Sequence, residues 1–108
     1  MAGSTSYSLN SVLSYGHLSV ITDSEGDDLA MYLGYALPLS GSELLLVKTL
    51  LRSIPVCLST KEISEATGIS VGQISVLVNR INRKAYGIGG RKLLHGTSHH
   101  GFRLNEFM

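Results

Sequence analysis

Residues 59–85 read STKEISEATGISVGQISVLVNRINRKA, and this stretch has the spacing of a helix–turn–helix. The positions that bury the contact between the two helices of such a motif are apolar here: Ile63, Ile69, Ile74 and Leu77. Ser64 is small enough to let the helices approach, and Gly68 suits the tight turn between them. A plain helical hairpin in a bundle requires neither the small residue nor the glycine at these offsets. The stretch therefore predicts a helix–turn–helix.

Three serines mark the starts of three helices. Each is followed three residues later by Glu or Gln, in the pairs Ser40–Glu43, Ser59–Glu62 and Ser70–Gln73. In such a capping box the serine hydroxyl accepts the amide of the third helical residue, whose side chain reaches back to the serine amide. We therefore expect helices over residues 41–53, 60–67 and 71–85. Gly87, Gly89 and Gly90 are expected to loosen the chain after the third helix.

The segment before these helices has a β pattern. Apolar residues at 18–21 indicate a short strand, and a polar turn follows at 22–28. Leu29, Met31 and Leu33 then occupy every second position, which is the pattern of a further strand. We expect an antiparallel sheet of three or four short strands. Its solvent-facing side should be polar, and a helix should cover its apolar side.

These elements define the expected architecture. The fold class is α+β, in one domain over residues 11–108. We expect a winged helix–turn–helix with an N-terminal antiparallel sheet (12–38), three helices (41–85) and a C-terminal β-hairpin wing (91–105). Residues 56–58 can add one further short strand. Residues 1–10 are small and polar, as in a linker or a cloning remnant.

Charge is distributed unevenly along the chain. Between Gly68 and Asn105 there are six basic residues and no acidic one, whereas the first 47 residues hold five acids and neither Lys nor Arg. The formal net charge of +1 therefore hides a dipole, whose positive end should attract a polyanion. With 44% hydrophobic and 16% charged residues, the composition is that of a globular domain.

The composition also bears on the cellular compartment. The longest strongly apolar run, residues 44–47, is far too short to cross a bilayer. No cationic start followed by an apolar block marks a secretory signal. The lone cysteine, Cys57, cannot form an internal disulfide, which favours the cytoplasm. We therefore expect a cytoplasmic protein that contacts no membrane.

On a helical wheel at roughly 100° per residue, the third helix has an apolar face and a polar one. The polar face holds amides, hydroxyls and cations but no carboxylate, although a solvated surface helix normally mixes Glu with Lys. Arg80 and Arg83 can fork onto guanine or phosphate. Asn79 and Gln73 can pair with adenine, and Val76 can contact a thymine methyl. The helix is therefore predicted to contact DNA through Gln73, Ser75, Val76, Asn79, Arg80, Asn82, Arg83 and Lys84.

The expected wing adds further cations beside the third helix. The residues assigned to a DNA groove or backbone there are Arg91, Lys92, His99, His100 and Arg103. The histidines flank a flexible turn with no Cys, Asp or Glu nearby, so we expect no metal site. No Ser–His–Asp arrangement is evident, so we expect neither an enzyme nor a cofactor.

In its order of motifs the chain resembles the OmpR/PhoB-type winged-helix effector domains of bacterial response regulators, from about residue 12 to residue 104. YGHL at 15–18 is similar to that family's first strand, and LSGSE at 39–43 to the start of its first helix. STKEI at 59–63 is similar to its second helix. The more specific motifs are ISVLVNRINRK at 74–84, similar to its recognition helix, and GFRL at 101–104, similar to its closing Gly-Tyr-x-Leu.

The resemblance implies a third helix in the major groove and a wing in a minor groove, with Val76, Asn79, Arg80 and Arg83 at DNA-facing positions. It implies a two-component transcription regulator that binds repeated half-sites as a homodimer, with a receiver domain upstream. RNA polymerase is implied as a partner through the loop between the second and third helices, which is very short here. The Trp usual after the second helix is absent, and Asn79 and Asn82 stand where the family has Arg, which predicts fewer phosphate contacts.

Two hypotheses from different classes follow. The first is a sequence-specific double-stranded DNA-binding domain of a transcription regulator. The second is a winged-helix protein–protein interaction module whose partner is acidic, because the same cations would serve either ligand. An enzyme comes third, and stoichiometric zinc at the histidines would revive it.

Overall fold

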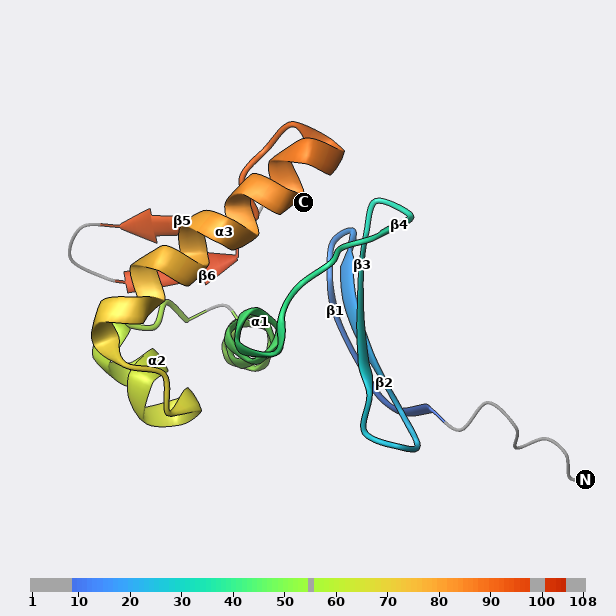
Figure 1. Cartoon of the computed structure of the whole chain (residues 1–108), viewed down its shortest axis with the longest axis horizontal. Coiled ribbons are helices and arrows are strands. Elements are labelled where there is room, and N and C mark those ends of the chain that lie inside the picture. Colours follow the sequence, from blue (N-terminus) through green and yellow to red (C-terminus); the bar gives the residue numbers. More distant parts are fainter. Residues whose placement is uncertain (1–8, 55, 98–100, 105–108) are drawn as a thin grey trace, which may run out of the picture.

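The computed structural model describes residues 9–54, 56–97 and 101–104 (Figure 1). A four-stranded antiparallel sheet comes first, in the order β1 (Leu9–Tyr15), β2 (Leu18–Asp23), β3 (Asp28–Tyr32) and β4 (Tyr35–Ala36). Three helices follow: α1 (Gly41–Ser53), α2 (Thr60–Thr67) and α3 (Val71–Gly89). The hairpin of β5 (Leu94–Thr97) and β6 (Gly101–Leu104) ends the described chain. The expected sheet, helices and wing are confirmed, although β1 begins inside the range expected to be a linker.

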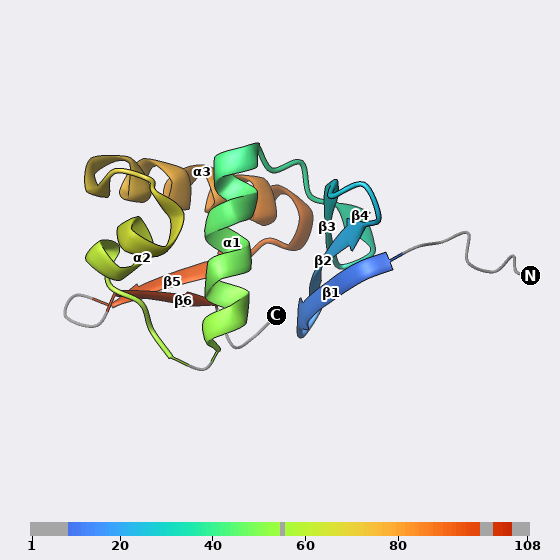
Figure 2. The same cartoon turned by 90° about the horizontal axis from the view of Figure 1, so that it is seen from below.

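Helix α1 lies between the sheet on one side and α2, α3 and the hairpin on the other (Figures 1 and 2). Its residues Leu46 and Val47 are fully buried. The sheet contributes Leu18, Val20 and Tyr32 to the same core. α3 contributes its apolar face, which consists of Ile74, Leu77, Val78, Ile81 and Ala85. Burial of these side chains supplies the main favourable term in folding, and it fixes which face of α3 points outward.

The outer face of the sheet is more apolar than expected. Opposite residues of neighbouring strands share a face, and the buried Val20 pairs with Ala30. That register turns Leu29 outward, with half of its surface exposed. Val12 pairs with Ile21 and Ile21 pairs with Leu29, so an apolar row crosses the outer face. The expectation of a polar solvent-facing side was therefore wrong for this row, whereas the neighbouring pair of Ser14 and Ser19 on the same face is polar.

Two of the three expected capping boxes are confirmed. The Ser40 hydroxyl accepts the Glu43 amide at 3.3 Å while the Ser40 amide donates to Glu43 at 2.8 Å, and Ser59 and Glu62 form the same pair of bonds. Ser70 makes no side-chain capping bond, so the third box was wrong. There the Gln73 amide donates to the backbone carbonyl of Ser70 instead, at 2.9 Å.

α3 is longer than expected, because it runs through Gly87 and ends at Gly89 instead of Ala85. Each helical glycine costs about 1 kcal/mol relative to alanine. Packing accounts for Gly89, because a Cβ there would lie 2.6 Å from a methyl group of Leu33 and 3.0 Å from the hydroxyl of Tyr32. The last turn of α3 therefore lies against the β3–β4 turn. Gly90, with a φ of 70°, ends the helix in the left-handed conformation.

Hydrogen bonds from Leu58 and from Asn82 of α3 help to join the hairpin to the helical core. Leu58 forms an isolated antiparallel bridge with Phe102, which is all that the structure shows of the strand expected over residues 56–58. The backbone bonds of that bridge measure 2.9 and 2.7 Å. The second connection, through Asn82 of α3, belongs to the candidate site. None of the helices in the described residues is long and apolar enough to cross a membrane.

Candidate nucleic-acid interface

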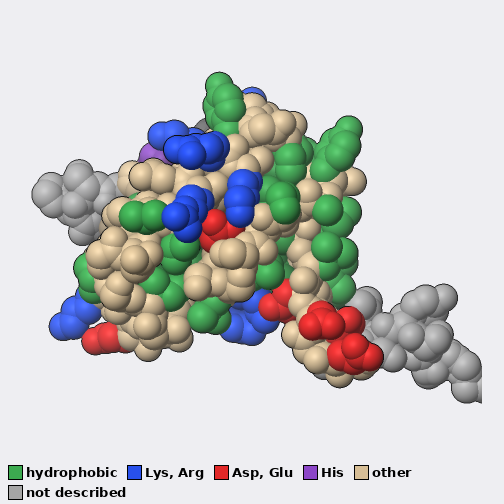
Figure 3. Space-filling view, in the orientation of Figure 1, with side chains coloured by type: hydrophobic (Ala, Val, Ile, Leu, Met, Phe, Trp, Pro, Cys, Tyr) green, Lys and Arg blue, Asp and Glu red, His purple; other side chains and the backbone are tan. Residues whose placement is uncertain are grey.

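The outward face of α3 presents the side chains that the sequence predicts there. Gln73, Ser75, Asn79, Arg80 and Arg83 are all exposed, and Val76 is 42% exposed. Lys and Arg side chains gather over α3 in the space-filling view (Figure 3). Among the described residues, neither Arg80 nor Arg83 forms an ion pair with a carboxylate. The cationic charge of this face is therefore not neutralised by Asp or Glu in that part of the chain.

Asn82 uses its side chain to hold the hairpin. Its amide nitrogen donates to the carbonyl of Leu94 at 3.1 Å, and its amide oxygen accepts the Leu94 N–H at 2.7 Å. Leu94 is buried, so these two bonds satisfy backbone groups that water does not reach. The predicted DNA contact of Asn82 is left with one amide hydrogen and one lone pair of the amide oxygen, because the other hydrogen and lone pair bond the first residue of β5.

Lys84 differs from the two arginines because it has a partner. Its ammonium lies 2.6 Å from a carboxylate oxygen of Glu43, whose side chain is only 2% exposed. Burial raises the pKa of Glu43, while the Lys84 ammonium and the Ser40 amide lower it, and the net pKa is below the ordinary value. The charge of Lys84 therefore balances a buried carboxylate and ties α3 to the start of α1.

The wing residues are only partly described. Arg91, Lys92 and His95 are exposed, and Arg103 is half-buried. His99 and His100, which the sequence assigned to DNA, lie outside the described residues. Two adjoining grooves separate α3 from the start of the hairpin, with volumes of about 350 and 320 Å³. Asn79, Asn82 and Lys92 line both, so the grooves form one continuous depression along α3.

The sequence analysis missed Tyr86, which lines the larger groove and is 61% exposed. It was overlooked because α3 was expected to end at Ala85. Two sequence features could have found it: Tyr86 lies three residues after Arg83, and Gly90 suits the end of a longer helix. The candidate interface thus contains an exposed aromatic ring beside two cations.

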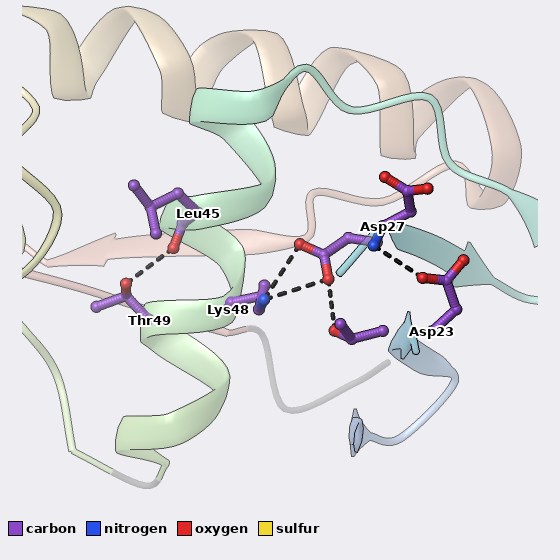
Figure 4. Close-up of polar contacts among 7 residues, drawn as sticks. Asp23, Asp27, Leu45, Lys48 and Thr49 are labelled. Carbon is purple, nitrogen blue, oxygen red and sulfur yellow. Dashed lines mark hydrogen bonds and ion pairs between the residues drawn. The ribbon is translucent and has the colours of Figure 1, made fainter. Parts of the chain in front are cut away.

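The acidic turn between β2 and β3 lies away from α3 (Figure 3). The other acidic residues lie elsewhere: Glu43 is beside Lys84, and the exposed Glu62 and Glu65 belong to α2. Asp23 accepts the backbone amide of Asp27 at 2.9 Å (Figure 4). It also accepts the amide of Glu25 at 2.9 Å, and the two bonds order that turn. Asp28 pairs with Lys48 of α1 at 3.1 Å. The Thr22 hydroxyl, with Lys48, lowers the pKa of Asp28. The sequence dipole is therefore also a dipole in space.

The described residues contain no cluster suited to a metal ion. Within 9–54, 56–97 and 101–104, no three His, Cys, Asp or Glu side chains come together in a way that could hold one. His17 and His95 are both exposed. The arrangement that the structure does provide is a cationic and amide-rich helix face next to a groove.

Comparison with known proteins identifies the fold but gives no relative by sequence. No protein-family model matches the chain, and no curated protein matches it. Among solved structures, the DNA-binding domain of Klebsiella pneumoniae RstA, determined in complex with the RstA box, is similar. The TM-score is 0.68 and the identity 13%, over 90% of this chain and 99% of that one. A likeness of this kind establishes that the chain has the winged-helix fold of that domain.

Proposed function

We propose that this chain is a sequence-specific double-stranded DNA-binding domain of a transcription regulator of the OmpR/PhoB type. In this proposal α3 occupies the major groove and the β5–β6 wing lies on the minor groove or the backbone. The observation that carries the proposal is the exposed outer face of α3. It holds amides and two arginines, without an ion pair to a described carboxylate. Arginine is the commonest residue to contact guanine specifically, and amides pair with adenine.

The position of each residue along α3 indicates which of the proposed contacts are made to bases. Gln73, Val76 and Arg80 follow one another at intervals of three and four residues, so they form one row on the helix. In a helix–turn–helix the recognition helix presents its N-terminal half to base edges. We therefore assign base contacts to this row, with Gln73 on adenine, Val76 on a thymine methyl and Arg80 on guanine.

Two further observations support DNA over other ligands. The acidic turn between β2 and β3 lies away from α3, so it does not repel a polyanion bound there (Figure 3). The fold is that of a domain solved in complex with its DNA box. By the same likeness and the sequence motifs, we propose binding to repeated half-sites as a homodimer, in the cytoplasm. A receiver domain and RNA polymerase are the further partners that the family resemblance implies.

Mobility-shift titrations of single alanine variants test the proposal. We expect Arg80→Ala to lose about 1–3 kcal/mol of binding free energy on a duplex selected from a random pool, and to bind with relaxed specificity at one position. Arg52→Ala is the matched control, because Arg52 is an exposed arginine at the far end of α1. For the intact domain, log K should fall with log salt by about 0.9 for each phosphate neutralised. Unchanged specific binding by the Arg80→Ala/Arg83→Ala double variant would contradict the assignment.

A protein-interaction module is the second candidate. The exposed Val76 and Tyr86 favour it, because apolar anchors among cations also suit an acidic protein surface. The same titration discriminates between the two functions. If the folded domain shifts no duplex even at low salt, the protein partner is favoured and the DNA proposal fails.

A further inference from the structure

The groove between α3 and the start of the hairpin is lined by cationic, amide and aromatic side chains. Asn79, Asn82, Arg83, Tyr86 and Lys92 line it, and its volume is about 350 Å³. Among the residues that the structure describes, the lining contains two cations, two amides and a phenol, but no carboxylate. Arg83 and Tyr86 are exposed, and Tyr86 has 61% of its surface in contact with solvent. This combination suits an anionic ligand that also offers an apolar face.

The four α3 residues of the groove form a single row. Asn82, Arg83 and Tyr86 follow Asn79 by three, four and seven residues, and this spacing places all four on one side of the helix. Gln73 and Arg80 lie on a neighbouring side of the helix, and Arg83, three residues after Arg80, lies between the two rows. The side of α3 with Asn79 and Tyr86 faces the hairpin, because Asn82 bonds Leu94 at the first residue of β5. α3 therefore has two outward rows, and only the one with Tyr86 borders this groove.

The groove is held in place before any ligand arrives. The two bonds between Asn82 and Leu94 fix β5 to α3, and Lys92 precedes Leu94 by two residues. Ala85, next to Tyr86, is fully buried, which anchors the turn of helix that carries the phenol. A site whose walls are already fixed loses less conformational entropy on binding.

We propose that this groove holds one phosphodiester and its deoxyribose from the DNA backbone, with Tyr86 as a binding residue. The inference rests on the proposed function and extends it. Arg83 and Lys92 neutralise the phosphate, the Tyr86 hydroxyl donates a hydrogen bond to a phosphate oxygen, and the phenol ring covers the sugar. Contacts of this kind position a protein on the duplex and carry no sequence information. Arg83 is thereby assigned to the backbone, and base recognition is left to the row of Gln73, Val76 and Arg80.

Two substitutions at Tyr86 test the inference, with Tyr35→Ala as the matched control. Tyr35 is an exposed tyrosine of β4 that does not line this groove. Dissociation constants are measured for a selected duplex and for a random one. We expect Tyr86→Ala to raise both dissociation constants by about tenfold, because loss of a hydrogen bond to a charged group weakens binding by about that factor or more. Tyr86→Phe keeps the ring and should lose most of that factor. Lys92→Ala should lower the salt slope by about 0.9, whereas the Tyr86 variants should leave it unchanged.

Three results would overturn the inference. If the Tyr86 variants bind both duplexes as tightly as the parent domain while Arg80→Ala loses specificity, the groove assignment fails and the DNA-binding proposal survives. If Tyr86→Ala weakens only the selected duplex, Tyr86 contacts a base and not the backbone. If the parent domain binds neither duplex, the proposed function fails and the groove assignment fails with it. Thermal unfolding should be the same for Tyr86→Phe as for the parent domain, since the phenol is largely exposed.

Discussion

Asn79 and Asn82 lie on the same side of α3 but have different environments. Asn79 is exposed, whereas the amide of Asn82 satisfies both backbone groups of the buried Leu94. We expect Asn82→Ala to lower the free energy of unfolding by about 1–3 kcal/mol, because the Leu94 N–H and C=O lose their partners. Asn79→Ala should change it by no more than about 0.5 kcal/mol. Urea denaturation of the two variants measures the difference. Equal stability would show that the hairpin is held without the asparagine.

The sequence could predict which residues of α3 are exposed but not what each one touches. A helical wheel separates Arg80 from Ile81 because the period of a helix is local. The partners of Asn82 and Lys84 come from segments distant in the chain, at Leu94 and Glu43. No local pattern contains such a contact. Both residues were therefore grouped with the DNA contacts on the basis of residue type and position on the helical wheel.

At the scale of elements, α1 and α3 are joined by the pair of Glu43 and Lys84. Glu43 also belongs to the capping box at the start of α1, so one buried carboxylate serves two helices. Its pKa is lowered in the folded state, so the pair stabilises the protein above the ordinary value of 4.5. This contribution is lost as the pH falls below that value through the lowered pKa.

The pair of Glu43 and Lys84 predicts how the stability of a Lys84 variant depends on pH. Lys84→Met leaves a buried carboxylate without its ammonium partner, and we expect it to lower the free energy of unfolding by about 1–3 kcal/mol at neutral pH. As the pH falls through the ordinary value of 4.5, the carboxylate takes up a proton more readily in the variant than in the parent domain, so the difference between the two should shrink. Lys61→Met, at an exposed lysine of α2, serves as the control. Urea denaturation at several pH values measures both, and a deficit independent of pH would contradict the role of the pair.

Helix starts were more predictable than helix ends. The boxes at Ser40 and Ser59 formed because each serine needs only its own third neighbour. The last turn of α3 makes a distant contact, since Gly89 lies against Tyr32 and Leu33 of the β3–β4 region. Three glycines in four residues, at 87, 89 and 90, predicted that the helix would already have ended. The packing of the β3–β4 turn shows why a glycine stands at position 89, and Gly90 is the local signal for the end of the helix.

For the whole molecule, the order of sheet, helices and hairpin was predictable, but the faces of the sheet were not. Turns and caps are encoded by neighbouring residues, so the elements could be recognised in order. Which side of β3 is buried depends on its pairing with β2, where Val20 lies opposite Ala30. A shift of one residue would exchange the two faces. The apolar row of Val12, Ile21 and Leu29 on the outer face is the consequence that composition did not reveal.

The spatial separation of charge is the property of the whole molecule on which the proposed function depends. Cations gather over α3, and the acidic turn between β2 and β3 lies at the other end (Figure 3). A polyanion should therefore approach from the side of α3 and the wing.

Backbone amide chemical shifts, followed while duplex DNA is titrated into the domain, report which face of the molecule binds DNA. We predict that the largest changes fall in α3 from Gln73 to Tyr86 and in the adjoining residues Lys92 to His95. Residues Asp23 to Asp28 of the acidic turn should stay unchanged. Changes confined to the outer face of the β1–β4 sheet, or no changes at low salt with the fold intact, would contradict it.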